Sequence, residues 1–264
     1  LNYDNQKLSI SGKGNVFIQD EFDQIKYEII KDKKQTNFDA ILDISKNTFL
    51  IDFLNYQKLE NSHLELKIKG RKNLKKDLTF DQISLKENDN LIFIKKLIFS
   101  DNYKLSDLEL LKIDFLDKEN LKNKVQISKE NKAYLVNGSS FNINSIVDKI
   151  LDSNIKKRAF FSDKKFKLEF DVKEIYFDKD SKMNNLQGFL MLKRNEITEL
   201  NLLSNFSEQK NIKFTIQTKD GEKITTLFSN EAKPLVDRYK FIKGFNDGSL
   251  DFYSIKKGGQ SKST

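Results

Sequence analysis

The chain has 264 residues and a formal net charge of +8, from 47 Lys and Arg against 39 Asp and Glu. It contains no Cys and one His, which excludes disulfide frameworks, thiolate metal sites, cysteine nucleophiles and sites built from several histidines. This length allows one large all-β unit or two ordinary domains. Composition therefore excludes several kinds of chemical site, whereas the length leaves the number of domains open.

The excess of lysine has two explanations. The chain is rich in Lys, Asn, Ile and Phe and poor in Pro, Gly and Trp, a skew typical of genes with A+T-rich codons. A basic sequence also raises the hypothesis of nucleic-acid binding. However, the phenylalanines alternate with charged residues, which places the two kinds on opposite faces of a strand. We therefore expect no nucleic-acid partner.

Apolar and charged residues alternate with a period of two over most of the chain, which predicts half-buried strands. In chain order, the predicted strands lie at 8–10, 16–18, 38–44, 64–68, 108–115, 125–127, 134–136, 166–172, 189–191, 200–202, 212–216 and 250–252. Turn signals separate them at 12–14, 87–90, 219–221 and 246–248. The pattern predicts a mainly antiparallel meander.

Two segments have a helical pattern instead. Asn144 is placed to cap a short helix with an apolar stripe formed by Ile146, Val147, Ile150 and Leu151. The second predicted helix covers 231–239 and opens at Asn230, with Pro234 among the first four positions, whose N–H groups lack partners within a helix. Two short helices cannot cover a sheet of this width.

The composition shifts near residues 153–158, which predicts a structural boundary there. We expect an N-terminal segment, 1–154, that ends in the first helix, and a C-terminal segment, 155–264, that contains the second. The longest apolar runs stop at four residues, far short of the roughly 20 that a membrane-spanning helix needs. Any membrane anchor is expected to lie outside these residues, in a longer protein.

Every predicted strand has one apolar face that must be covered, because burying a large apolar side chain is worth roughly 1.5–3 kcal/mol. Two arrangements satisfy this requirement. Two sheets can pack face to face in a sandwich, or one long sheet can curve and leave an apolar concavity that needs a ligand. A continuous strip of this kind suits acyl chains.

No pattern in the sequence indicates catalysis, a metal or a cofactor. His63 lies beside an alternating strand and is expected at the surface. Gly12-Lys13-Gly14 lacks the spacing of a phosphate-binding loop and is expected to be a turn. Asp178-Lys179-Asp180 lacks the glycine-centred loop of a calcium site. The basic run 70–76 is expected to be a hydrated loop, with anionic lipid head groups as its alternative partner.

The stretch from Ile224 to Phe252 resembles a known family. Glu231-Ala232 matches its helix start, Leu235-Val236 its apolar pair and Gly248-x-Leu250 its strand opening, whereas Lys233 and Asp247 replace two glycines of the pattern. These residues are similar to the AsmA-like domain of bacterial envelope proteins of the YhdP and TamB kind. The strands at 170–177, 186–190 and 212–216 are similar to the hairpins that precede that helix.

The resemblance implies a mainly β fold, with a long curved antiparallel sheet, or β-groove, and two short helices. It also implies an inner-membrane-anchored periplasmic protein of a Gram-negative bacterium that carries phospholipid towards the outer membrane without catalysis. Phospholipid acyl chains, the inner membrane and outer-membrane or envelope proteins are the implied partners. The groove would be lined by Leu64, Leu66, Ile68, Phe166, Leu168, Phe170, Val172, Ile212, Phe214, Ile216, Leu250 and Phe252.

Two other functions remain open at this point. The chain would be a non-enzymatic assembly factor in outer-membrane biogenesis if it formed a closed β-sandwich without a lipid channel. A basic nucleic-acid binder is the third candidate, and it would bind polyanions with a steep dependence on salt.

Overall fold

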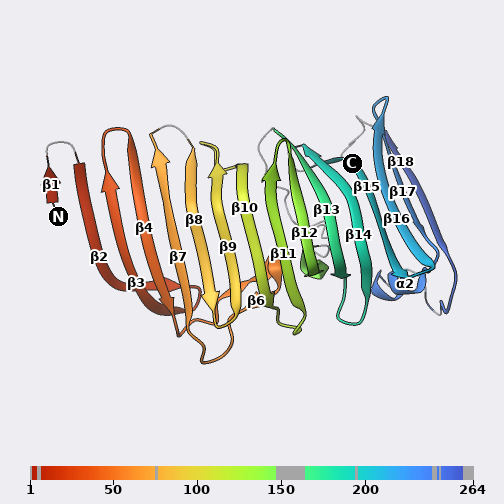
Figure 1. Cartoon of the computed structure of the whole chain (residues 1–264), viewed down its shortest axis with the longest axis horizontal. Coiled ribbons are helices and arrows are strands. Elements are labelled where there is room, and N and C mark those ends of the chain that lie inside the picture. Colours follow the sequence, from red (N-terminus) through yellow and green to blue (C-terminus); the bar gives the residue numbers. More distant parts are fainter. Residues whose placement is uncertain are drawn as a thin grey trace, which may run out of the picture.

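The computed structural model describes residues 2–4, 7–74, 77–146, 164–193, 196–239, 243 and 245–257. Sixteen strands form one sheet (Figure 1). The first ten in the order of the sheet are β1 (Asn2–Asp4), β2 (Lys7–Ile18), β3 (Glu21–Lys31), β4 (Gln35–Ile44), β7 (Leu64–Asn73), β8 (Leu78–Glu87), β9 (Asn90–Phe99), β10 (Leu105–Leu116), β11 (Lys122–Glu130) and β12 (Ala133–Asn142). The others are β13 (Lys165–Tyr176), β14 (Lys182–Lys193), β15 (Glu196–Ser207), β16 (Lys210–Lys219), β17 (Glu222–Ser229) and β18 (Leu250–Lys257).

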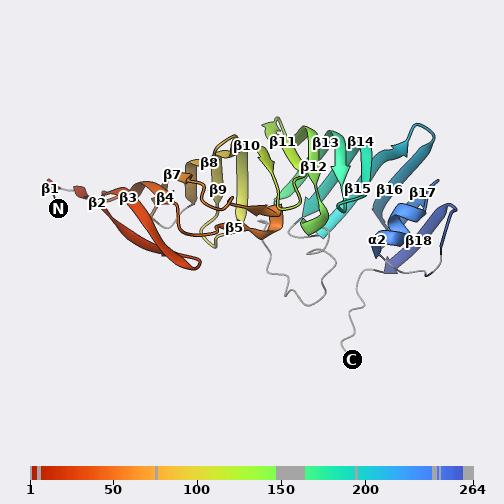
Figure 2. The ribbon, with the colours of Figure 1, turned by 90° about the horizontal axis from the view of Figure 1, so that it is seen from below.

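The order of the strands in the sheet follows the chain. Neighbours pair antiparallel, except that β12 and β13 are parallel. Seen from below, the strands form an arch that does not close (Figure 2). This confirms the predicted long, curved, mainly antiparallel sheet with two short helices. The closed sandwich is wrong, because all the long strands belong to one sheet.

The connection from β4 to β7, residues 45–63, packs against one face of the sheet. It contains β5 (Leu50–Ile51), the 3-10 helix η1 (Asp52–Leu54) and β6 (Tyr56–Gln57). Leu54 and Tyr56 are buried in one cluster with Leu85, Ile92 and Ile113 of the sheet. The 45–63 segment lies at the lower ends of the strands and on the inner side of the arch (Figures 1 and 2).

The second predicted helix is present, but it begins later than expected. Helix α2 covers Lys233–Tyr239. The amide of Asn230 donates to the carbonyl of Asn211 and the amide of Ala232 to that of Gly248, and residues 231 and 232 lie outside the helix. Pro234 is the second helical residue, where no N–H is needed. Residues 144–146 are helical at the first predicted site, and Val147, Ile150 and Leu151 lie outside the described residues.

Two predicted loops are wrong. Gly12-Lys13-Gly14 continues β2 instead of forming a turn. The ring of Tyr27, directly opposite Gly12, lies about where a side chain at Gly12 would lie, with its Oη 3.0 Å from an ideal Cβ. In the basic run, Gly70 to Asn73 belong to β7, and residues 75 and 76 lie outside the described ranges. The predicted boundary between 154 and 155 also lies outside them.

Candidate apolar binding face

Directly paired residues place a continuous apolar row on one face of the sheet. Because cross-strand partners lie on the same face, the register can be followed from strand to strand. One row crosses every strand from β2 to β18, and we call it the apolar ladder. It consists of Gly12, Tyr27, Ala40, Ile68, Ile83, Ile94, Leu111, Ile127, Val136, Phe170, Gly188, Leu202, Phe214, Leu227 and Phe252.

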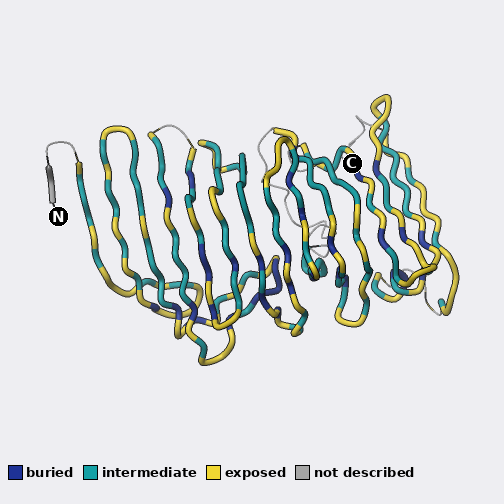
Figure 3. The backbone as a smooth tube through the Cα atoms, viewed as in Figure 1, coloured by how far each residue is buried: buried dark blue, intermediate teal, exposed yellow. Residues whose placement is uncertain are grey.

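Most of the ladder is only partly covered by protein. Its large side chains are half-buried, apart from buried Val136 and from Phe252, which is 47% exposed. A core layer between two sheets would be buried, as Leu85 and Ile92 are beneath the 45–63 segment. Figure 3 shows buried positions where that segment meets the lower strand ends. The ladder is therefore a surface that water reaches on the inner side of the arch.

The register places all twelve predicted lining residues on this face. Ile68, Phe170, Phe214 and Phe252 belong to the ladder itself. Leu66, Leu168 and Leu250 are half-buried beside it. The other five are buried against protein: Leu64, Phe166, Val172, Ile212 and Ile216. Leu64 is in the cluster beneath the 45–63 segment and Val172 is in a second cluster with Val125 and Val136.

Eight large residues of the ladder were absent from the predicted set, namely Tyr27, Ile83, Ile94, Leu111, Ile127, Val136, Leu202 and Leu227. Several lie in strands that alternation does predict, such as 108–115 and 125–127. Alternation shows which residues share a face within a strand, but it does not show which residue lies opposite in the next strand. The register therefore had to come from the structure.

A buried carboxylate holds the start of the 45–63 segment. Asp23 of β3 is 3% exposed and accepts hydrogen bonds from the amides of Ser45, Lys46 and Asn47 at 2.9–3.1 Å. The side-chain nitrogen of Asn47 adds a fourth bond at 2.6 Å. Burial raises the pKa of Asp23, but these hydrogen bonds outweigh it and leave the pKa below its usual value.

A second buried carboxylate holds the end of the segment. Glu87 of β8 is 1% exposed and accepts hydrogen bonds from the Tyr56 hydroxyl at 2.7 Å, the Leu59 amide at 2.6 Å and the Ser62 hydroxyl. Burial raises the pKa of Glu87, but the hydrogen bonds outweigh it and lower the pKa overall. The segment is thus fixed at both ends over the lower part of the face.

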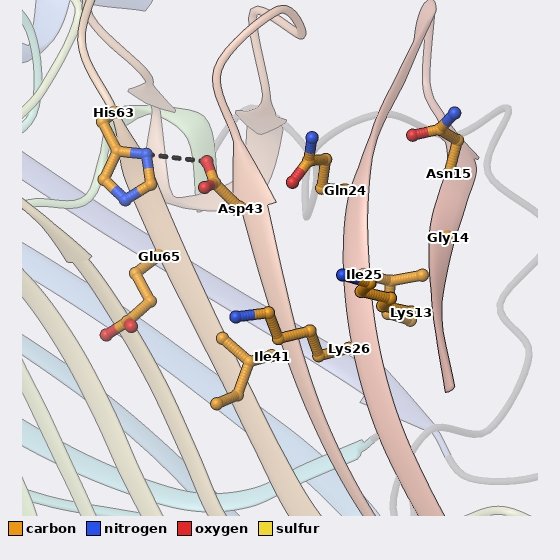
Figure 4. A pocket seen from close by; sticks show the side chains of 10 residues that line it. All are labelled: Lys13, Gly14, Asn15, Gln24, Ile25, Lys26, Ile41, Asp43, His63 and Glu65. Carbon is orange, nitrogen blue, oxygen red and sulfur yellow. Dashed lines mark ion pairs between the residues drawn. The ribbon is translucent and has the colours of Figure 1, made fainter. Parts of the chain in front are cut away.

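The opposite face carries a polar pocket around the single histidine (Figure 4). His63 Nδ1 lies 2.8 Å from Asp43 Oδ1, and both side chains are about half exposed, at 59% and 49%. Lys26 and Glu65 also line this pocket, but no Ser, Thr or Tyr does. Among the residues that line it, the pocket therefore supplies no hydroxyl nucleophile for this pair to activate.

Among the described residues, no three His, Asp or Glu side chains are grouped so that they could hold a metal ion. Within the same ranges, no helix is both long and apolar enough to cross a membrane. The chain matches no family model, no curated protein and no solved structure. We therefore infer the function from the geometry of the sheet.

Proposed function

We propose that this chain binds lipid acyl chains along the apolar ladder and is a segment of an inner-membrane-anchored periplasmic protein of the AsmA-like kind. In this role it carries phospholipid between the inner and outer membranes. The observation that supports the proposal is the ladder, an unbroken row of apolar or glycine positions across the strands from β2 to β18.

The length of the row determines how much free energy a ligand can gain by covering it. Full burial of one large apolar side chain is worth roughly 1.5–3 kcal/mol. A ligand that covers the exposed part of a half-buried side chain therefore gains part of that free energy. Monomeric proteins rarely expose contiguous apolar patches larger than a few hundred Å². A row of half-buried Ile, Leu and Phe residues on one face therefore favours hydrocarbon chains that contact this face at many strands.

The opposite face of the same strands is polar. Lys213 lies between the ladder residue Phe214 and buried Ile212, and Asp171 lies between Phe170 and Val172. Such alternation keeps one face in water while the other contacts hydrocarbon. Movement of lipid along the ladder would then be passive, because every step exchanges one apolar contact for a similar one.

Site-specific photocrosslinking tests the proposal. A benzophenone amino acid is placed at Phe214 or Phe170 in the cell, and the purified protein is analysed by mass spectrometry for attached lipid. The matched controls carry the same group at Lys213 or Asp171, one residue away and on the opposite face. Crosslinked phospholipid at the first two positions and none at the controls supports the proposal. Absence of lipid at all four positions contradicts it.

One observation favours an assembly role as the second candidate. Strand β18 is the last strand in the described order, and its Tyr253 and Ile255 are 61% and 48% exposed. An edge strand with exposed apolar residues can pair with a strand of another chain. Crosslinks from Tyr253 to an envelope protein, without any lipid on the ladder, would favour this candidate over lipid transport.

A further inference from the structure

Five lysines of the apolar face lie at the upper ends of its strands, whereas Lys210, at the lower end of β16, pairs with Glu231 at 2.9 Å. Lys31, Lys72 and Lys256 each lie four residues after a ladder residue, Lys129 lies two after Ile127, and Lys223 lies four before Leu227. An even spacing within a strand keeps a residue on the same face. All five are at the upper strand ends in Figure 1, away from the 45–63 segment. We call these five residues the lysine rim.

The cations at the lower strand ends have structural roles instead. Lys58 is buried, and its Nζ donates to the carbonyls of Ser45, Leu59 and Ser62 at 3.0–3.3 Å. Arg238 of α2 donates to the carbonyl of Phe177 at 3.0 Å. These groups already bind protein acceptors, so the apolar face has available cations mainly at its upper end.

Two lysines of the rim lie directly opposite each other. Lys223 of β17 and Lys256 of β18 are cross-strand partners on the apolar face. Like charges in this position repel each other and destabilise the pairing. The nearby Glu222 contacts Lys257 at 3.8 Å on the other face, and within the described ranges neither Lys223 nor Lys256 has an ion-pair partner. An anion bound between them would relieve the repulsion.

Two other lysines of the rim have partners within the protein. Lys129 contacts Asp107 at 2.6 Å, and the Tyr134 hydroxyl donates to the same carboxylate at 2.7 Å. Lys72 lies over the ring of Tyr103, with its Nζ 5.2 Å from the centroid. The positive charge of the rim is thus concentrated at the directly opposed pair Lys223 and Lys256.

The distance from ladder to rim fits a lipid. Four residues of strand span about 13 Å, and the acyl chains of one leaflet span about 15 Å, half of the hydrocarbon thickness of a bilayer. Acyl chains that cross the ladder would therefore place their phosphate near the lysine rim. At β4 and β7 to β10, the lower end of the same face is covered by the 45–63 segment, so a head group there has only the upper side on which to lie.

We propose that the lysine rim binds the phosphate of anionic lipid head groups, so that the apolar face prefers lipids with net negative charge over zwitterionic ones. This inference rests on the proposed function, since it names the class of lipid that the ladder would hold. Lys223 and Lys256 form its strongest contact, because they share one face and have no described counter-ion.

The experiment measures lipid selection by the full chain. Purified protein is incubated with vesicles of equal phosphatidylglycerol and phosphatidylcholine and recovered, and its bound lipid is quantified by mass spectrometry. The test variant is Lys223→Gln with Lys256→Gln. The control is Lys165→Gln with Lys193→Gln, another directly opposed lysine pair at the upper strand ends but on the polar face. Both variants lose two positive charges.

The expected result is that the wild-type chain and the control retain mainly phosphatidylglycerol, and that the test variant loses this preference by about thirtyfold, as expected for two lysines near a phosphate. Equal retention of both lipids by the wild type would overturn the inference and leave the proposed function standing. Binding of neither lipid would overturn the proposed function. An equal loss in both variants would show a general charge effect and also overturn the inference.

Discussion

The hydroxyl of Tyr56 donates a 2.7 Å hydrogen bond to the carboxylate of Glu87, and both side chains are almost fully buried. The ring of Tyr56 also packs edge-to-face on Phe115, with centroids 5.2 Å apart. One tyrosine from the β4–β7 connection therefore links a polar anchor to the apolar cluster. This contact holds the 45–63 segment over the lower end of the apolar face.

Removing the charge of Glu87 should release this segment. Glu87→Gln replaces an acceptor-only group with one that also carries donors, opposite three donors from Tyr56, Leu59 and Ser62. We expect a loss of about 2 kcal/mol in the free energy of unfolding and faster proteolysis within 45–63. Urea denaturation and limited proteolysis measure these effects. Glu60→Gln, an exposed change in the same segment, should leave both unchanged.

Stability should fall in acid because two anchoring carboxylates have lowered pKa values. The pKa values of Asp23 and Glu87 are lower in the folded chain than their usual values. Their contribution is therefore complete above the unfolded-state pKa values of about 4 and is lost as the pH falls through the folded-state values. Thermal unfolding between pH 7 and pH 3 should show a smaller drop in Asp23→Asn and Glu87→Gln than in the wild type. An unchanged drop would argue against these anchors.

Two phenylalanines on the same face should differ in their effect on stability. Phe115 is fully buried beneath the 45–63 segment, whereas Phe214 is half-buried on the ladder. Phe115→Ala should cost about 3–5 kcal/mol because it leaves a cavity. Phe214→Ala should cost about 1–2 kcal/mol because its side chain is already partly in water. Urea midpoints of lipid-free protein compare the two, and similar large losses would indicate a closed core at Phe214.

Gly188 is needed for its backbone conformation. Its φ is +129°, and a Cβ added there would lie 1.9 Å from the carbonyl oxygen of Asn201 on β15. Gly188→Ala should therefore shift β14 against β15 and destabilise the fold by about 2 kcal/mol or more. Gly14→Ala is the control, because a Cβ there meets nothing within 4 Å. It should be neutral or slightly stabilising in thermal unfolding.

The sequence by itself determined the class of fold. Charged and apolar residues alternate along the strands, as at Phe166 to Val172 and Ile212 to Ile216, and this pattern requires a sheet with one apolar face. The helical stripe at Leu235 and Val236 also predicted a helix near its observed place. These are local properties, since each depends on residues a few positions apart.

Only the tertiary structure decided which residues form the ladder and which are covered. The alignment of Val136 with Phe170 comes from a parallel pairing between residues 34 positions apart. The burial of Leu64 depends on a connection that folds back onto the sheet and is fixed by Asp23 and Glu87. Register and covering segments depend on contacts between distant residues, and a period of two within each strand carries no information about them.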